Sequence, residues 1–198
     1  MDFSEILLDN PVIAAVKDFK QLDAAINSNI EVIFVLFGDI LSIKDISQMI
    51  YEKNKVGIVH VDLIEGLNQK EAAVKYLRKE TKFKGIISTK PQTIKLAKEN
   101  GFITIQRSFI FDTISLKNAK DHLASSIDAV EILPGLIPKV TYSLSKNINK
   151  PIICGGLIET KEEVMMALSS GATSVSTTKR PPKNVSTNSF SFIFPIKP

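Results

Sequence analysis

The chain has few of the residues that build covalent or metal-held frameworks. Its 198 residues include one cysteine, Cys154, and two histidines, so an internal disulfide is excluded and no Cys/His cluster has zinc-site spacing. The first residues, MDFSEILLDNP, lack the basic segment that begins a secretory signal. The longest apolar run, Val32 to Phe37, is far shorter than the roughly 18 residues that a membrane-spanning helix needs. We therefore expect a soluble protein of the reducing cytoplasm, with no membrane partner.

The sequence also lacks the motifs of several enzyme classes. No Gly-x-Gly-x-x-Gly follows the first predicted strand, no Gly-x-Ser-x-Gly occurs, and no cluster of carboxylates indicates a metal site. Cys154 lies in an apolar run, which predicts a buried strand residue rather than a nucleophile. The sequence therefore marks no catalytic residue, metal ligand or cofactor site by motif alone.

What the sequence does contain is a regular alternation of short apolar runs and segments with helical spacing. The eight apolar runs lie at 11–16, 31–37, 56–62, 84–89, 101–107, 128–134, 150–156 and 172–178. The seven helical segments lie at 19–27, 43–53, 69–79, 92–99, 116–125, 137–146 and 162–169. Apolar runs joined by helical crossovers indicate parallel strands that are buried on both faces.

Such βα units can close into a barrel or form an open, doubly wound sheet. The barrel is favoured because Gly155-Gly156 ends the seventh run and Ser176-Thr177-Thr178 ends the eighth, where barrels commonly bind phosphate. We predict a small (β/α)8 TIM barrel, α/β in class, as a single domain over residues 1–178. Residues 179–198 contain Pro181-Pro182 where an eighth helix should follow, so we expect a basic, Pro- and Phe-containing tail that is mobile or aberrant.

Two groups of residues are candidates for ligand binding. Gly155, Gly156, Ser176 and Thr177 can supply the N–H and O–H donors that a phosphate needs, although the glycines can also simply turn the chain and the hydroxyls satisfy local backbone groups. Polar side chains at strand ends are candidates for contacts to a polyol, because the carboxyl ends of barrel strands surround the mouth. These are His60, Asp62, Lys90, Arg107 and Glu131, with Lys17 and Asp39 as weaker candidates.

Within the second group, the i, i+2 spacing of His60 and Asp62 predicts that both share one face of a strand. Each residue of the group can instead be a surface residue or a partner at a helix entry. Lys90 can form a Schiff base if desolvation lowers its pKa, but Pro91 follows it, which favours a lysine at a helix start.

Charge is unevenly distributed along the chain. Residues 1–66 contain five basic and 11 acidic residues, whereas residues 70–98 contain nine basic and two acidic residues, a net charge of +7. This basic stretch covers two neighbouring helices, so its charges form a stripe that can contact nucleic-acid phosphates or remain a solvated face. The candidate RNA-binding residues are Lys70, Lys75, Arg78, Lys79, Lys82, Lys84, Lys95 and Lys98, with Tyr76 and Phe83 interleaved.

Taken together, the motifs resemble the glycerol-3-phosphate-responsive antiterminator family. The resemblance is carried by Lys17-Asp18 after PVIAAV, Phe37 to Ile40, His60 to Leu67, Gly85 to Lys90, Gln106 to Phe109, Glu131 to Gly135, Gly155 to Ile158, Gly171-Ala172 and Val175 to Thr177. It covers residues 1–178 and ends where the Pro-rich tail stands in place of a closing helix.

The resemblance implies a TIM-barrel RNA-binding regulator of glycerol uptake genes, with glycerol 3-phosphate as effector and leader mRNA as target. It implies that the ends of strands seven and eight hold the phosphate and that the polar strand ends hold the hydroxyls. It implies no enzyme activity and no cofactor, and leaves homo-oligomer formation open. The alternatives are a TIM-barrel enzyme that acts on a glycerol phosphate or sugar phosphate, with Asp62 or Glu131 as acid/base, and a catalytically silent metabolite-binding scaffold.

Overall fold

The chain folds into a closed barrel of eight parallel strands. The computed structural model describes residues 2–67, 70–121, 123 and 126–179. The strands are β1 (Val12–Val16), β2 (Val32–Val35), β3 (Val56–His60), β4 (Gly85–Ser88), β5 (Ile103–Phe109), β6 (Ala129–Leu133), β7 (Ile152–Gly155) and β8 (Ser174–Thr177). The helices are α1 (Phe3–Asp9), α2 (Phe19–Ile26), α3 (Ile43–Glu52), α4 (Glu71–Glu80), α5 (Pro91–Glu99), α6 (Thr113–Asp121), α7 (Pro138–Ser145) and α8 (Lys161–Ser169).

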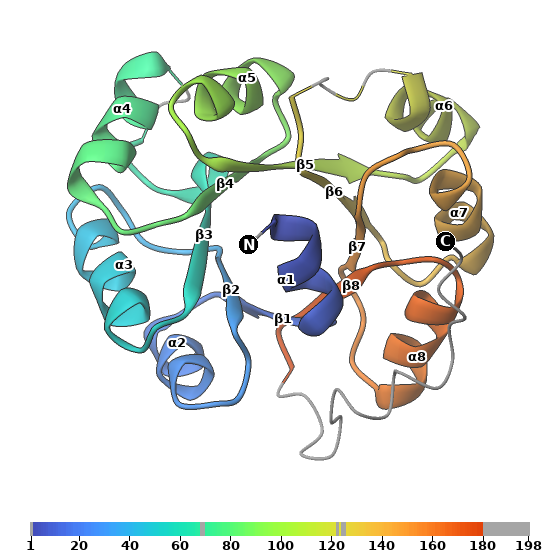
Figure 1. The fold of residues 1–198 in the computed structure, drawn as a ribbon, viewed down its shortest axis with the longest axis horizontal. Helices are drawn as coiled ribbons and strands as arrows, with labels where there is room; N and C mark the ends of the chain where they lie inside the picture. Colours follow the sequence, from blue (N-terminus) through green and yellow to red (C-terminus); the bar gives the residue numbers. More distant parts are fainter. Residues whose placement is uncertain (1, 68–69, 122, 124–125, 180–198) are drawn as a thin grey trace.

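Each strand pairs with its neighbours in sequence, and β8 pairs with β1 to close the barrel. Successive strand residues face alternately into the barrel and toward the helices. The inner residues, among them Ile13, Phe34 and Ile105, form one buried apolar cluster, and the outer residues pack against the helices in two further clusters. Figure 1 shows helices α2 to α8 around the outside of the strands.

Helix α1 closes the end of the barrel at which the strands begin. Its Phe3 and Leu7 are buried in the inner cluster with Ile13 and Val32. The Ser174 hydroxyl donates a hydrogen bond to the Leu7 carbonyl at 3.0 Å, which ties α1 to the start of β8. Figure 1 shows α1 across the centre of the ring of strands. The opposite, carboxyl end of the barrel is therefore the mouth.

The predicted barrel, its eight strands and its seven outer helices are confirmed. Helix α1 was not predicted. The third apolar run was predicted as strand through Asp62, but β3 ends at His60 and Asp62 lies in a 3-10 turn, Val61–Leu63. Within the described residues, β8 is followed only by Thr178 and Lys179. Residues 180–198 of the predicted tail lie outside the described residues. No helix in the described ranges is long and apolar enough to span a membrane.

Candidate functional site at the barrel mouth

A buried ion pair lies at the centre of the mouth. Arg107 on β5 and Glu131 on β6 are register partners on adjacent strands, so their side chains enter the barrel side by side. Arg107 Nε donates to Glu131 Oε2 at 2.7 Å, and the Ser176 hydroxyl donates to Glu131 Oε1 at 2.6 Å. The two charged side chains are 8% and 1% exposed. A pair this deeply buried requires hydrogen bonds on both carboxylate oxygens, because desolvation would otherwise outweigh the Coulomb attraction.

Gly155 makes room for this ion pair. A Cβ atom at position 155 would lie 2.6 Å from Ser176 Oγ and 2.7 Å from Glu131 Oε1, closer than van der Waals contact permits. Only glycine therefore fits beside the bond between Ser176 and Glu131. The sequence predicted Gly155 from its place at a strand end, but its steric role depends on a glutamate 24 residues earlier and was not predicted.

His60 ends β3 with its side chain in the barrel, two residues after the inner-cluster residue Ile58. The imidazole is buried, and its Nδ1 has no hydrogen-bond partner among the described residues. Burial, followed by the charge of Arg107, lowers the pKa of His60 from 6.5 to about 4, against an opposing effect of Asp62. The imidazole is therefore neutral near pH 7, with a nitrogen available to a ligand group.

Asp62 lies in surroundings different from those predicted, whereas Lys90 lies at the helix start that the sequence favours. Because Asp62 follows β3 in a 3-10 turn, it does not share a strand face with His60, and that prediction is wrong. Its carboxylate accepts hydrogen bonds from the Ser88 hydroxyl at 2.8 Å and from the Thr89 N–H and hydroxyl at 2.7 and 2.9 Å. Asp62 thus fixes the loop after β4. Lys90 is the exposed residue that precedes α5, and the helix start predicted for it is confirmed.

The four candidate phosphate-binding residues lie at the ends of β7 and β8 but do not all face the mouth. Ser176 faces Glu131 inside the barrel, whereas the Thr177 hydroxyl donates to the Ile158 carbonyl at 2.7 Å. Gly156 follows β7 with a φ of +74°, a left-handed conformation that suits glycine. The structure therefore brings together His60, Arg107, Glu131, Gly155 and Ser176, with Gly156 beside them and Thr177 turned outward.

Cys154 is buried in β7, as predicted, and its Sγ lies 3.3 Å from the Thr141 hydroxyl oxygen. Burial raises the pKa of the thiol to about 11, so it remains protonated near pH 7. Within the described parts of the chain, no three His, Cys, Asp or Glu side chains gather as potential metal ligands.

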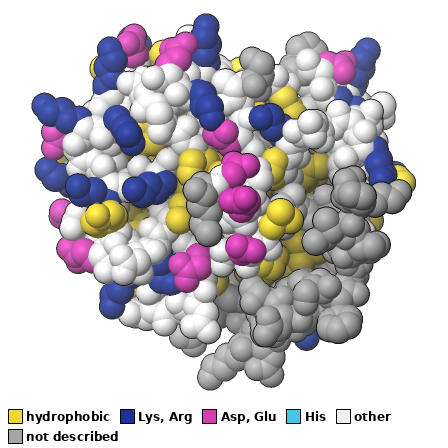
Figure 2. Space-filling view, viewed as in Figure 1, with side chains coloured by type: hydrophobic (Ala, Val, Ile, Leu, Met, Phe, Trp, Pro, Cys, Tyr) yellow, Lys and Arg dark blue, Asp and Glu magenta, His cyan; other side chains and the backbone are white. Residues whose placement is uncertain are grey.

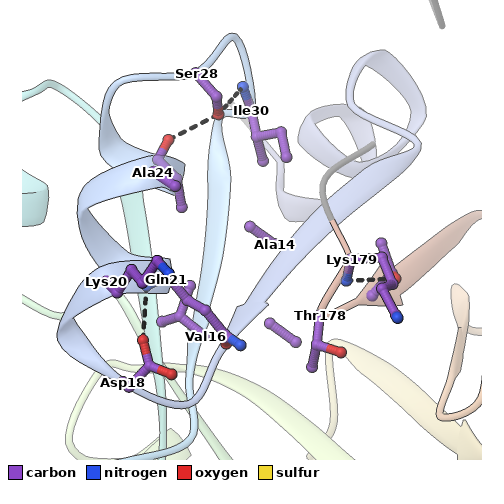
Figure 3. A pocket seen from close by; sticks show the side chains of 13 residues that line it. Ala14, Val16, Asp18, Lys20, Gln21, Ala24, Ser28, Ile30, Thr178 and Lys179 are labelled. Carbon is purple, nitrogen blue, oxygen red and sulfur yellow. Dashed lines mark hydrogen bonds between the residues drawn. The ribbon is translucent and has the colours of Figure 1, made fainter. Parts of the chain in front are cut away.

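A separate groove of about 520 Å³ lies outside the barrel, between α2 and the ends of β1 and β8 (Figure 3). Ala14 and Val16 line it from the outer face of β1, and Ala25 and Ile30 line it from α2 and the loop after it. Thr178 and Lys179 form its other side. This is the position at which a helix following β8 would pack.

The basic candidates are all exposed on α4, α5 and the segments that flank them. Some of their charges have local partners. Lys75 pairs with Glu71 at 2.6 Å, Lys98 pairs with Asp128 at 2.6 Å, and Arg78 lies 5.5 Å above the ring of Phe102. Lys79, Lys82, Lys84 and Lys95 form no ion pair with any described acidic side chain.

The interleaved aromatic residues named from the sequence do not lie free on this surface. Phe83 is buried, and the Tyr76 hydroxyl donates to the Ile40 carbonyl at 3.1 Å. The exposed ring near these lysines belongs to Tyr51 at the end of α3, with the Nζ atoms of Lys82 and Lys84 over it. Tyr51 was missed because it lies 31 residues before Lys82 in the sequence.

The fold and the mouth define a TIM-barrel protein whose buried polar side chains gather where barrels of this class bind small molecules. The sequence profile described as "Glycerol-3-phosphate responsive antiterminator" matches residues 12–181, and the chain belongs to this family.

Three proteins similar to this chain are one relative by sequence and two solved structures. The uncharacterized protein YgcP of Escherichia coli K12 is 42% identical over 179 residues, which cover 90% of this chain and 94% of YgcP. The crystal structure of a glycerol uptake operon antiterminator regulatory protein from Listeria monocytogenes has a TM-score of 0.79 at 28% identity, covering 88% of this chain and 93% of that one. An antiterminator-related protein from Thermotoga maritima has a TM-score of 0.76 at 29% identity, covering 85% and 95%. Family and structures support a regulatory role.

Proposed function

We propose that this protein is a glycerol-3-phosphate-responsive regulator that binds the ester in the barrel mouth and acts on leader mRNA to prevent transcription termination. The proposal that the ester binds in the mouth rests on the buried polar groups there. These are the ion pair of Arg107 and Glu131 and the Nδ1 atom of His60, which has no hydrogen-bond partner among the described residues. A buried polar atom without a partner is costly, and a ligand hydroxyl would relieve that cost.

The chemistry of the mouth suits a small polyol phosphate. Arg107 uses Nε on Glu131, which leaves the other guanidinium N–H groups as donors for an anionic or hydroxyl oxygen. Neutral His60 offers a donor or acceptor to a hydroxyl, depending on its tautomer. The backbone at Gly155-Gly156 and the end of β8 would receive the phosphate, as in other barrels with this corner. Asp62 and Lys90 would act at the rim, Asp62 by holding the loop that carries Lys90.

The ligand proposal is tested by thermal unfolding with glycerol 3-phosphate, glycerol and inorganic phosphate, because a ligand of the folded state raises its stability. We expect a shift with the ester that exceeds the shift with either fragment. The variant Arg107→Met/Glu131→Leu replaces a buried pair by apolar side chains, a change that often preserves stability, and should lose the shift. The matched control is Lys44→Met/Glu80→Leu, which removes a surface pair of 3.0 Å and should keep it.

RNA binding is proposed from the family and from the eight exposed basic side chains on α4, α5 and their flanks. Leader-RNA affinity should depend steeply on salt, since each neutralised phosphate releases counterions. Its measurement with and without glycerol 3-phosphate tests the proposal. Absence of RNA affinity under both conditions, with ligand binding intact, would instead favour a silent metabolite-binding scaffold. Turnover of the ester, or a borohydride-trapped adduct at Lys90, would favour an enzyme.

A further inference from the structure

Tyr51 presents a half-exposed ring at the end of the barrel opposite the mouth. The residue lies in the last turn of α3, and 48% of it is exposed. The Nζ atoms of Lys82 and Lys84 lie 5.6 and 5.9 Å from the centre of its ring. These lysines come from the segment between α4 and β4, so two elements that are distant in sequence meet at one aromatic side chain.

The segment that carries the two lysines is held by the fold. Phe83 between them is buried against Gly57 and Ile50, so the residues on either side of it point outward. The Lys82 N–H donates to Ser47 Oγ on α3 at 3.0 Å, and the Lys84 N–H donates to the Gly57 carbonyl of β3 at 2.9 Å. The backbone is thus fixed on both sides of Phe83, while the lysine side chains remain exposed.

Lys82 and Lys84 are both exposed, and one acidic residue, Glu52, follows Tyr51 at the end of α3. Neither Lys82 nor Lys84 forms an ion pair with an acidic side chain in the described ranges. Figure 2, viewed onto the face that carries α1, shows Lys and Arg side chains gathered on the side where α3 and α4 lie, with some acidic side chains among them and others near the centre. An extended anion is therefore attracted to the α3–α4 side of this face.

The geometry points to a base-stacking platform for single-stranded RNA, formed by Tyr51 with Lys82 and Lys84; the inference rests on the proposed RNA-binding function. A flat, half-exposed ring binds the face of an unpaired base. The ammonium groups of the two lysines lie over the ring in the free protein and bind the phosphates that flank the base when the base takes their place. An acidic protein segment would also pair with the lysines, but would use the ring only where it carries a planar or apolar side chain. A chain that carries a planar base and a phosphate in every unit uses both features.

The chain contains a matched control for this arrangement. Tyr142 on α7 is 59% exposed, with Lys146 Nζ 5.3 Å from its ring centre. That lysine directly follows the same helix, four residues after Tyr142, and lies outside the basic stretch from Lys70 to Lys98. A change at Tyr142 thus removes a tyrosine–lysine contact of the same kind without changing the proposed platform.

The sequence contains no tryptophan, so Tyr51→Trp and Tyr142→Trp each give a protein with a single indole. Stacking of a base on the indole quenches its fluorescence. With an unpaired leader-RNA segment as the probe, we expect saturable quenching for Tyr51→Trp and none for Tyr142→Trp. We expect Tyr51→Ala to weaken RNA binding by about 5- to 150-fold, the range for loss of one stacking contact. Tyr51→Phe should bind as the parent protein does, because it retains the ring.

The lysines are tested by salt dependence. Lys82→Gln/Lys84→Gln should reduce the slope of log affinity against log salt by about 1.4, since each single-strand phosphate contact contributes about 0.7. Polyglutamate, which has charge but no bases, should bind weakly and should not distinguish Tyr51→Ala from the parent.

Failure of this inference is distinguishable from failure of the proposed function. If the parent protein binds RNA and Tyr51→Ala binds it equally well, the platform is wrong and RNA binding stands. If quenching is equal at positions 51 and 142, the platform is wrong as well. If the parent protein binds no RNA under any condition, both the proposed RNA-binding function and the platform are overturned.

Discussion

At the residue scale, His60 is a group whose ionisation the fold opposes. Its pKa falls from 6.5 to about 4 because it is buried and lies near Arg107, despite the opposing effect of Asp62. The unfolded chain therefore binds a proton on His60 at a higher pH than the folded chain does. The contribution of neutral His60 to the free energy of unfolding is therefore complete above pH 6.5. It is lost progressively as the pH falls toward 4.

We expect this loss to reach about 3 kcal/mol near pH 4, since one pKa unit corresponds to about 1.4 kcal/mol. The free energy of unfolding, measured by urea titration between pH 7 and pH 4, should fall less steeply for His60→Asn than for the parent. This interval contains the pKa of His60 in the unfolded chain, 6.5, and reaches its pKa in the folded protein, about 4. Carboxylates with lowered pKa, such as Asp39 and Glu163, contribute equally to both proteins. Parallel curves for the two proteins would contradict the assignment.

Also at the residue scale, Gly155→Ala should destabilise the fold because the new Cβ would overlap the Ser176 hydroxyl and Glu131. We expect a loss of about 1–3 kcal/mol, the usual cost of overpacking a buried site. Ser176→Ala removes the nearest obstructing atom, so its combination with Gly155→Ala should cost less than the sum of the single changes. Chemical denaturation of the four proteins measures this coupling, and strictly additive costs would show that the two positions do not collide.

At the scale of elements, α1 closes one end of the barrel through a few side chains. Leu7 is fully buried, whereas the adjacent Leu8 is 68% exposed. Leu7→Ala should therefore reduce the free energy of unfolding by about 2–5 kcal/mol, the range for truncating a buried leucine. Leu8→Ala should change it by less than about 0.5 kcal/mol. Similar costs at both positions, measured by thermal or urea unfolding, would mean that α1 is not docked as the structure has it.

The same element shows what could and could not be predicted from the sequence. The strands and outer helices were predicted because apolar residues recur at strand and helix spacing over whole segments. Helix α1 has only seven residues, and its buried residues Phe3 and Leu7 make too short a pattern. Asp62 was misplaced because an apolar run does not mark where a strand gives way to a turn.

The strand ends predicted which polar residues lie toward the carboxyl end of the barrel, but the contacts among those residues were not predicted. The direct pairing of Arg107 with Glu131 depends on the register of β5 against β6. The approach of Ser176 to the same carboxylate depends on closure of the barrel, and Gly155 is constrained by both. Contacts between residues on different strands depend on how the strands are aligned in the closed barrel, and the sequence pattern of a single strand does not contain that information.

At the scale of the whole molecule, the candidate ligand site and the inferred RNA platform lie at opposite ends of the barrel. His60 and Glu131 lie at or near the carboxyl ends of their strands, whereas Lys84 directly precedes the start of β4. Neither ligand would touch the other, so any effect of one on the other must pass through the barrel. Such an effect can be no larger than the difference in affinity that each ligand has for two states of the protein.

This separation leads to a prediction about reciprocity. If glycerol 3-phosphate raises the affinity for leader RNA by some factor, RNA must raise the affinity for glycerol 3-phosphate by the same factor, typically about 5- to 150-fold in coupled systems. Calorimetric titration of the ester with and without saturating RNA, set beside RNA titration with and without the ester, measures both factors. Arg107→Met/Glu131→Leu should bind RNA with one affinity whether or not the ester is present, because it lacks the proposed ligand contacts. A factor of one in both directions for the parent protein would mean that the mouth binds its ligand without controlling the RNA surface.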